Sequence, residues 1–252
     1  MNFSLRIPLQ TTAEQSAKLQ DLQRVFALAC NALAPMVQGT SCWNRVALHH
    51  MAYKQLRQQF PELGSQMVCN AIYSVSRTCR IIYQHPQSPF NSHQRAGKPL
   101  PRVHFLRQSP VYFDRHTLSL KKGVVSMLTL DGRMRFNLPL APADEQRFRE
   151  HKLREIVLTG PDGQFTLTFL FAAEGEAEAE AATAANNGAA MQPAPAQAGA
   201  DVAALAEYVL IVDAAVGTDP KDLQPSGLSG SPLIASQAAV SPTAPSPANA
   251  TP

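Results

Sequence analysis

The chain has 252 residues, enough for one large domain or two small ones, and 45% of them are hydrophobic, so a buried core is possible. No stretch approaches the roughly 18 apolar residues of a membrane-spanning helix, and the N-terminus lacks the apolar region of a signal peptide. We therefore expect a cytoplasmic protein without a membrane partner. Residues 172–252 are rich in Ala, Gly, Pro and Ser, which is typical of a disordered low-complexity tail.

The formal net charge of +3 hides a strong asymmetry along the chain. Residues 1–171 contain 21 Lys and Arg against 10 Asp and Glu, a net charge of +11. Residues 172–252 contain 1 Lys and 9 Asp and Glu, a net charge of −8. A body this basic favours a polyanionic partner, most often nucleic acid. A well-solvated surface balanced by an acidic tail is the alternative.

The four cysteines are Cys30, Cys42, Cys69 and Cys79, and no two of them form a C-x-x-C pair. The usual sequence signature of a structural zinc site is therefore missing. Three of the four fall in predicted helices, where a free thiol packs as a small apolar side chain. We expect reduced, structural thiols and neither a metal site nor a cofactor in this chain.

The first part of the chain predicts one strand followed by a long helix. Residues 3–9 alternate apolar and polar side chains, as a half-buried strand does. A capping box follows in one of two registers, Thr11 with Glu14 or Thr12 with Gln15, and begins a helix that reaches about Val37.

Two further helices are predicted, each with one apolar row. Ser41 is expected to cap a helix that reaches Phe60, and Ser65 to begin a third helix. The inward rows of the three helices are expected to be Leu19, Leu22, Phe26, Ala29, Leu33 and Val37; Leu48, Ala52, Leu56 and Phe60; and Val68, Ala71, Val75, Cys79 and Ile82. Three amphipathic helices with short connections predict a helical bundle over residues 11–84, and residues 85–99 predict a basic loop.

The hydrophobic period then changes to two. Apolar-polar alternation on either side of Asp131-Gly132 predicts one β-hairpin, and alternation around "PDGQ" predicts a second. The first strand is expected to join this later sheet. The sequence therefore predicts an α+β fold: a small antiparallel β-barrel, residues 1–10 and 100–171, with an inserted three-helix bundle and a disordered low-complexity tail.

The order of these segments resembles the N-terminal half of the TnpB (OrfB) family, the RNA-guided nucleases of insertion-sequence transposons and relatives of type V CRISPR effectors. The resemblance covers roughly residues 3–171. It is carried by "YFDRHTLSL" and "VSMLTLDGRMRFNL", which are similar to the family's β-barrel module, and by single matching positions. These positions are Thr12, Glu14, Gln15, Leu19, Asn31, Tyr53, Leu56, Arg57, Phe60, Pro61, Leu63, Gln66 and Ala71. In that family the helical insertion and the barrel grip guide RNA and the guide–target duplex.

The family's catalytic part is a RuvC-like nuclease domain, whose first strand ends in a metal-binding Asp. Residues 208–217, "YVLIVDAAVG", resemble that strand, with Asp213 in the place of the acid, but the spacing from Asp213 to Gly217 departs from the family pattern. The later catalytic Glu, the final Asp and the zinc ribbon have no counterparts in the sequence. Because two-metal cleavage needs several converging carboxylates, we expect no intact catalytic residue and at most a vestigial one in Asp213. Mg²⁺ is expected only if a separate chain supplies a nuclease half.

Basic residues outside the predicted core are the candidates for phosphate contact. They are Arg77, Arg80, Arg95, Lys98, Arg102, Arg107, Arg115, Lys121, Lys122, Arg133 and Arg135. For each of them a solvated surface is the alternative interpretation, most of all for Arg133 and Arg135, which share one face of a predicted strand.

The resulting hypothesis is a transposase-associated, TnpB-like protein that binds structured guide RNA and possibly target DNA without a working nuclease. Such a chain would be either a retained nuclease-dead binder or a truncated remnant of a mobile element. Residues 172–207 would form a linker and residues 218–252 a disordered tail. The alternatives are a protein–protein adaptor with a basic body and an acidic tail, and one half of a split RNA-guided DNA endonuclease.

Overall fold

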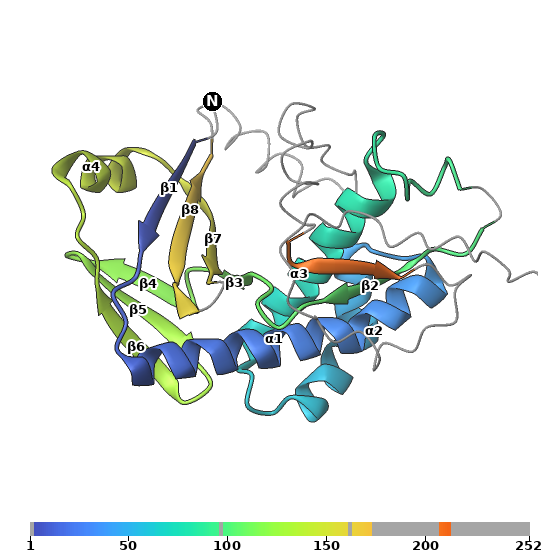
Figure 1. Ribbon diagram of the computed structural model, residues 1–252, viewed down its shortest axis with the longest axis horizontal. Coiled ribbons are helices and arrows are strands. Elements are labelled where there is room, and N and C mark those ends of the chain that lie inside the picture. Colours follow the sequence, from blue (N-terminus) through green and yellow to red (C-terminus); the bar gives the residue numbers. More distant parts are fainter. Residues whose placement is uncertain (1–2, 96–97, 161–162, 173–206, 213–252) are drawn as a thin grey trace, which may run out of the picture.

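The computed structural model describes residues 3–95, 98–160, 163–172 and 207–212 (Figure 1). Its helices are α1 (Ala13–Thr40), α2 (Arg45–Gln59), α3 (Ser65–Gln84) and α4 (Pro142–Glu150). Its strands are β1 (Phe3–Pro8), β2 (Arg102–Phe105), β3 (Val111–Phe113), β4 (Leu118–Lys121), β5 (Val124–Thr129), β6 (Gly132–Asn137), β7 (Leu153–Thr159), β8 (Thr166–Phe171) and β9 (Val209–Val212). The predicted α+β class with antiparallel sheets is confirmed. Residues 173–206 and 213–252, which hold most of the predicted linker and tail, lie outside the described residues.

The strands form three antiparallel sheets: a four-stranded sheet in the order β1-β8-β7-β3, a three-stranded sheet β4-β5-β6, and a two-stranded sheet β2-β9. The first strand joins the later sheet as predicted, because β1 pairs with β8. The predicted small β-barrel is wrong for the described residues, whose strands do not form a closed barrel. Strand β2 does not bridge the two larger sheets, since it pairs with β9 and is held against α1.

The strand register places one apolar face of the four-stranded sheet in the core. Leu5, Phe169, Ile156 and Phe113 lie side by side across its four strands, and Ile7, Leu167, Leu158 and Val111 form the next row. Because side chains alternate along a strand, the residues between these rows lie on the opposite face of the sheet.

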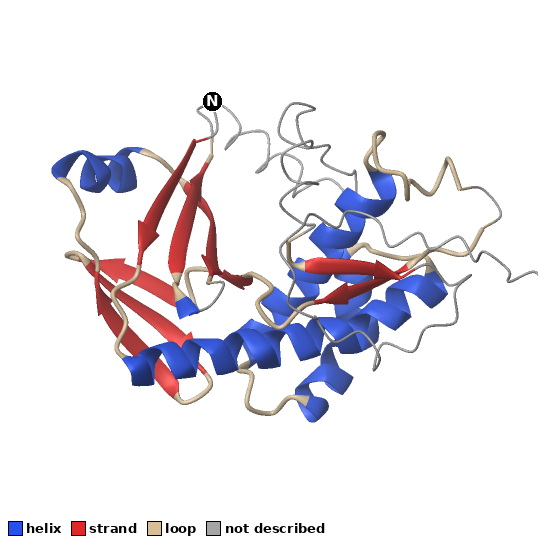
Figure 2. Ribbon diagram, in the orientation of Figure 1, coloured by secondary structure: helices blue, strands red, loops and turns tan. Residues whose placement is uncertain are grey.

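Helices α1, α2 and α3 follow β1 in the chain, and α3 packs against both α1 and α2. Figure 2 shows α1 running beneath the two larger sheets and on toward α2 and α3. Every residue of the three predicted inward rows is buried. The 3.6-residue apolar period therefore identified the core faces of these helices correctly.

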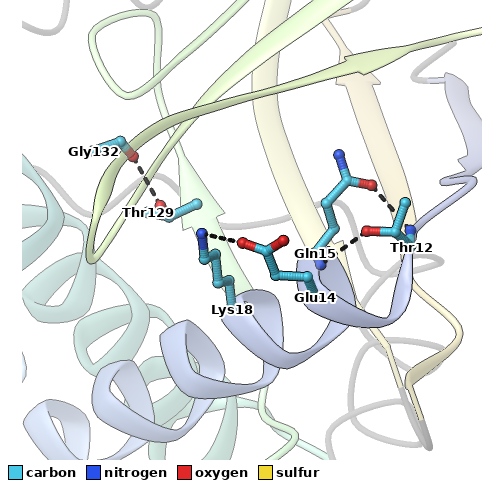
Figure 3. Close-up of polar contacts among 6 residues, drawn as sticks. All are labelled: Thr12, Glu14, Gln15, Lys18, Thr129 and Gly132. Carbon is cyan, nitrogen blue, oxygen red and sulfur yellow. Dashed lines mark hydrogen bonds and ion pairs between the residues drawn. The ribbon is translucent and has the colours of Figure 1, made fainter.

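The start of α1 uses the second of the two predicted capping registers (Figure 3). The Gln15 backbone N–H donates to Thr12 Oγ1 at 3.2 Å, and the Thr12 N–H donates to Gln15 Oε1 at 3.0 Å. Glu14 pairs with Lys18 at 2.8 Å instead of closing a capping box with Thr11. The reciprocal bonds satisfy two backbone donors that helix geometry leaves without partners.

The predicted start of α2 at Ser41 is wrong. Ser41 lies at the C-terminal end of α1 with a φ of 50°, a left-handed conformation that ends a helix. Asn44 caps α2 instead, because its Oδ1 accepts from the backbone N–H of Val46 at 2.9 Å and of Ala47 at 3.1 Å.

Helix α4 was not predicted from the sequence, although its segment carries helix signals. Pro142 occupies the first turn, Asp144 and Glu145 lie near the N-terminal end, and Arg147 and Arg149 lie near the C-terminal end. This order of charges complements the helix dipole. No residue of α4 is buried, so the helix has no apolar row that periodicity could detect.

Side-chain amides of α1 hold the segment that contains β2. Asn31 Nδ2 donates to the Phe105 carbonyl at 2.9 Å, and the Phe105 N–H donates to Asn31 Oδ1 at 2.7 Å. Gln38 Nε2 donates to the Leu100 carbonyl at 2.9 Å, and Gln23 Nε2 to the Gln108 carbonyl at 3.3 Å. These amides are spaced seven or eight residues apart, so they share one face of the helix. We call them the α1 amide row: Gln23, Asn31 and Gln38.

Replacing Asn31 by Ala is expected to lower the free energy of unfolding by about 2 kcal/mol, because two partly buried backbone groups of Phe105 lose their partner. Urea unfolding of the full chain measures the loss. Gln55→Ala is the matched control, an exposed amide on α2; its effect is expected to stay within about 0.5 kcal/mol. Equal effects of the two variants would contradict the role given to Asn31.

The buried thiols make stability depend on alkaline pH. Burial raises the pKa of Cys79 from 9.0 to about 12. The unfolded chain loses this proton near pH 9, whereas the folded chain keeps it, so the stabilisation is complete below pH 9 and is lost as the pH rises toward 12. Between pH 7.5 and 10.5, the unfolding free energy of Cys79→Ala is expected to fall less steeply with pH than that of the parent protein. Above pH 9 the two slopes should differ by roughly 1 kcal/mol per pH unit. Val75→Ala, a buried change without a titrating group, should leave the slope as in the parent protein.

Candidate nucleic-acid interface

The three-stranded sheet has one apolar and one basic face. Val125, Met127 and Phe136 are buried on the first face. Arg133 and Arg135 alternate with Met134 and Phe136, and together with Lys121 they are exposed on the other face. The register places Arg135 beside Ser126 and Ser119, and Arg133 beside Leu128. Strands β4, β5 and β6 contain no Asp or Glu.

Two turns add further cations at the ends of this face. Arg133 donates to the Ser126 carbonyl at 3.1 Å and to the His116 carbonyl at 2.6 Å, which fixes its guanidinium beside the turn that contains Arg115. Lys122 forms the tight β4–β5 turn with Gly123, both with positive φ, at the other end of β4. We call this set the basic sheet face: Arg115, Lys121, Lys122, Arg133 and Arg135.

The structure brings together these five of the predicted phosphate-binding residues, but the other six lie elsewhere. Arg77 and Arg80 are on α3, Arg95 and Lys98 follow it, Arg102 is on β2, and Arg107 comes after β2. Figure 1 shows α3 and β2 on the opposite side of the view from β4, β5 and β6.

Several of these six residues make contacts within the protein. The Arg102 Nε donates to Gln38 Oε1 at 3.1 Å, and the Arg95 guanidinium lies 5.8 Å from the centre of the Phe90 ring. Lys98 and Arg107 are exposed. The predicted basic loop is tied to the end of α3, because the Ser92 N–H donates to the Tyr83 carbonyl at 2.8 Å and the Ser88 hydroxyl to the Ile82 carbonyl at 2.5 Å.

A groove of about 660 Å³ lies over the second face of the four-stranded sheet. Its floor follows the strand register: Arg6 on β1 lies beside Thr168 on β8, and the same row continues through Val157 on β7 to Tyr112 on β3. A parallel row contributes Pro8, Thr166 and Thr159. The groove is therefore a direct consequence of the alternation that puts the apolar rows into the core.

The walls of the groove come from α3 and from the residues before β9. Arg77 lines one part, and Glu207 and Tyr208 line another. The backbone carbonyl of Tyr208 accepts from the Leu106 N–H at 2.9 Å and from the Ser109 hydroxyl at 2.8 Å, so its position is fixed. Burial raises the pKa of the Tyr208 hydroxyl, and the neighbouring Glu207 carboxylate raises it further.

Arg77 is oriented toward the sheet by a polar network. Its Nε lies 3.7 Å from Glu155 Oε1, and its guanidinium lies 5.9 Å from the centre of the Tyr112 ring. The Tyr73 hydroxyl donates to the same Glu155 oxygen at 2.7 Å. Burial raises the pKa of Tyr73, and the Glu155 charge adds to the effect. Arg77 is thus neither on a plain solvated helix face nor part of the basic sheet face.

Arg6, Tyr112 and Tyr208 line the groove but are not among the site residues that the sequence predicted. Arg6 occupies a polar position of the alternating strand, so the pattern already indicated that it lies opposite the core. Tyr208 had no such signal, because its place beside Arg6 depends on β9 pairing with the distant β2.

Asp213, the vestigial catalytic candidate, lies outside the described residues, although β9 ends directly before it. Among the described residues, no group of three or more His, Cys, Asp or Glu side chains is placed to hold a metal ion. None of the described helices is long and apolar enough to cross a membrane. Neither a scan against protein-family models nor a search of curated proteins gave a match.

The polar network around Arg77 gives a direct test of the groove geometry. In a double-mutant cycle, Tyr73→Phe and Glu155→Gln are expected to show a coupling energy of about 1 to 2 kcal/mol, since a hydrogen bond to a charged acceptor is among the stronger ones. Urea unfolding of the parent and the three variants measures it. A cycle that pairs Glu155→Gln with Tyr53→Phe on α2 is the control and should be additive. A coupling near zero for Tyr73 would contradict the network.

Proposed function

We propose that this protein binds nucleic acid and corresponds to the N-terminal, RNA-gripping half of a TnpB-like effector. In this proposal residues 11–84 act as a three-helix bundle inserted after β1, and the sheets that follow supply the second gripping surface. Residues 172–207 serve as a linker and residues 218–252 as a tail. The bound molecule is a structured guide RNA, with target DNA reached through pairing with that guide.

The observation that supports this proposal is the basic sheet face. A sheet with one buried apolar face and one exposed face of Lys, Arg and Ser presents several cations at fixed spacing, without an acid on its strands to repel phosphates. All five of these cations are exposed. The nearest acids in the chain, Asp114 and Asp131, lie in the turns that flank these strands and not on the strands themselves.

Cleavage is not part of the proposed function. Two Mg²⁺ ions need several converging carboxylates, and the described residues do not fit such a site, because they gather no group of three potential ligands. Under this proposal the chain is a nuclease-dead binder, a truncated remnant, or one half of a split nuclease whose catalytic carboxylates belong to another chain.

The salt dependence of RNA binding tests the proposal. For the full chain and a structured RNA hairpin, Lys121→Ala combined with Arg135→Ala is expected to weaken binding at all sequences and to reduce the slope of log Kd against log salt by roughly 2, because two phosphate contacts are lost. Fluorescence anisotropy between 50 and 300 mM salt provides the measurement.

Lys54→Ala combined with Lys152→Ala is the matched control, since it removes the same charge from two exposed positions outside the basic sheet face. An equal change in slope for the control would show general charge attraction instead of a defined interface. If the parent protein does not bind RNA even at low salt, the adaptor function becomes the better explanation.

A further inference from the structure

The groove on the four-stranded sheet has the size and the chemistry of a nucleotide site. Its volume of about 660 Å³ lies within the range of small-molecule pockets. The row from Arg6 to Tyr112 crosses three interstrand steps of about 4.8 Å, roughly 14 Å in all, so the floor is long enough to seat a nucleotide.

Two arginines make the groove suitable for a phosphate group. Arg6 projects from the sheet floor and Arg77 from α3, and Glu155 and Tyr112 hold Arg77 in place. Thr168 lies beside Arg6, and its hydroxyl is a further donor suited to a phosphate oxygen. Arginine and hydroxyl donors together are the usual contacts of nucleic-acid phosphates.

The remaining lining suits a base and a ribose. Tyr208 lines the groove and is half-buried, and its backbone is held by Leu106 and Ser109, so its aromatic ring offers a face for a stacked base. Pro8 and Pro110 add apolar surface. Glu207, next to Tyr208, is an acceptor that a bare anion site would not need, and carboxylates commonly accept hydrogen bonds from ribose hydroxyls.

We propose that the groove binds one ribonucleotide unit, with its phosphate at Arg6 and Arg77, its base on Tyr208 and its ribose at Glu207. The unit is either an unpaired nucleotide of a bound RNA strand or a free nucleotide, since both present the same groups. The first of these sources, a bound RNA strand, rests on the proposed function. Nucleotide binding in the groove does not rest on it, because the groove residues are distinct from the basic sheet face.

Three probes on the full chain separate these cases: a labelled 12-nucleotide single-stranded RNA, a blunt RNA duplex, and adenosine 5′-monophosphate. Tyr208→Leu and Arg6→Gln are each expected to weaken binding of the single-stranded RNA about tenfold, because one stacked base or one phosphate contact is lost. Binding of the duplex, whose bases are already stacked, should change less than twofold. Glu207→Gln should reduce the preference for this RNA over the DNA of the same sequence.

The matched controls are Tyr53→Leu on α2 and Arg149→Gln on α4, which make the same changes outside the groove and should leave all three affinities unchanged. Thr168→Val is a milder groove variant that keeps the shape of the strand residue. A thermal unfolding curve for each variant confirms that it is folded at the assay temperature.

The two proposals fail in different ways. If adenosine monophosphate binds and Tyr208→Leu abolishes its binding, the groove is a nucleotide site even when no strand binds, and the source is the free nucleotide. If Lys121→Ala with Arg135→Ala weakens both RNAs while the groove variants change nothing, the proposed function stands and the groove inference is overturned. The groove inference is also overturned if all three groove variants, Thr168→Val, Tyr208→Leu and Arg6→Gln, bind every probe as the parent protein does.

Discussion

The α1 amide row is the interaction on which the arrangement of the second half of the chain depends. A primary amide carries a donor and an acceptor in the same geometry as a peptide group, so Asn31 can pair with the backbone of Phe105 as a neighbouring strand would. This fixes β2 against the helix. Strand β2 then pairs with β9, and β9 brings Tyr208 to the edge of the four-stranded sheet. A helix side chain thus determines the wall of a groove that the helix itself does not line.

Both larger sheets use the same physical principle to separate packing from surface chemistry. Strand alternation sends every second side chain into the core and leaves the others on the opposite face. On the three-stranded sheet that opposite face is open and carries Arg133 and Arg135. On the four-stranded sheet it is partly covered by α3 and by the residues before β9, which turns a flat polar surface into a groove. A flat surface suits an extended polyanion, whereas a groove suits a single unit of it.

The elements that the sequence predicted well are those whose signal is local and repeated. The apolar rows of α1, α2 and α3, the two hairpins and the pairing of the first strand with the later sheet are all found in the structure. Helix starts were less predictable, because Ser41 and Asn44 are both good caps and only the backbone conformation decides between them. The basic sheet face follows from alternation, but the groove could not be predicted, since it requires the pairing of β2 with a strand about a hundred residues away. The β-barrel was predicted wrongly because the strands divide into three separate sheets, and β2 pairs with the distant β9 instead of joining either larger sheet.

The pairing of β9 with β2 also decides where this protein can be shortened. Composition alone would place a domain boundary after Phe171, where the aromatic and β-branched residues become sparse. A fragment cut there would lose β9 and uncover the edge of β2 beside Val103 and Phe105, both of which are buried in the intact chain. Exposed apolar strand edges are templates for unwanted pairing between molecules. A fragment meant for biochemistry or crystallisation should therefore retain the chain through Val212, including a long stretch whose composition would suggest that it is dispensable.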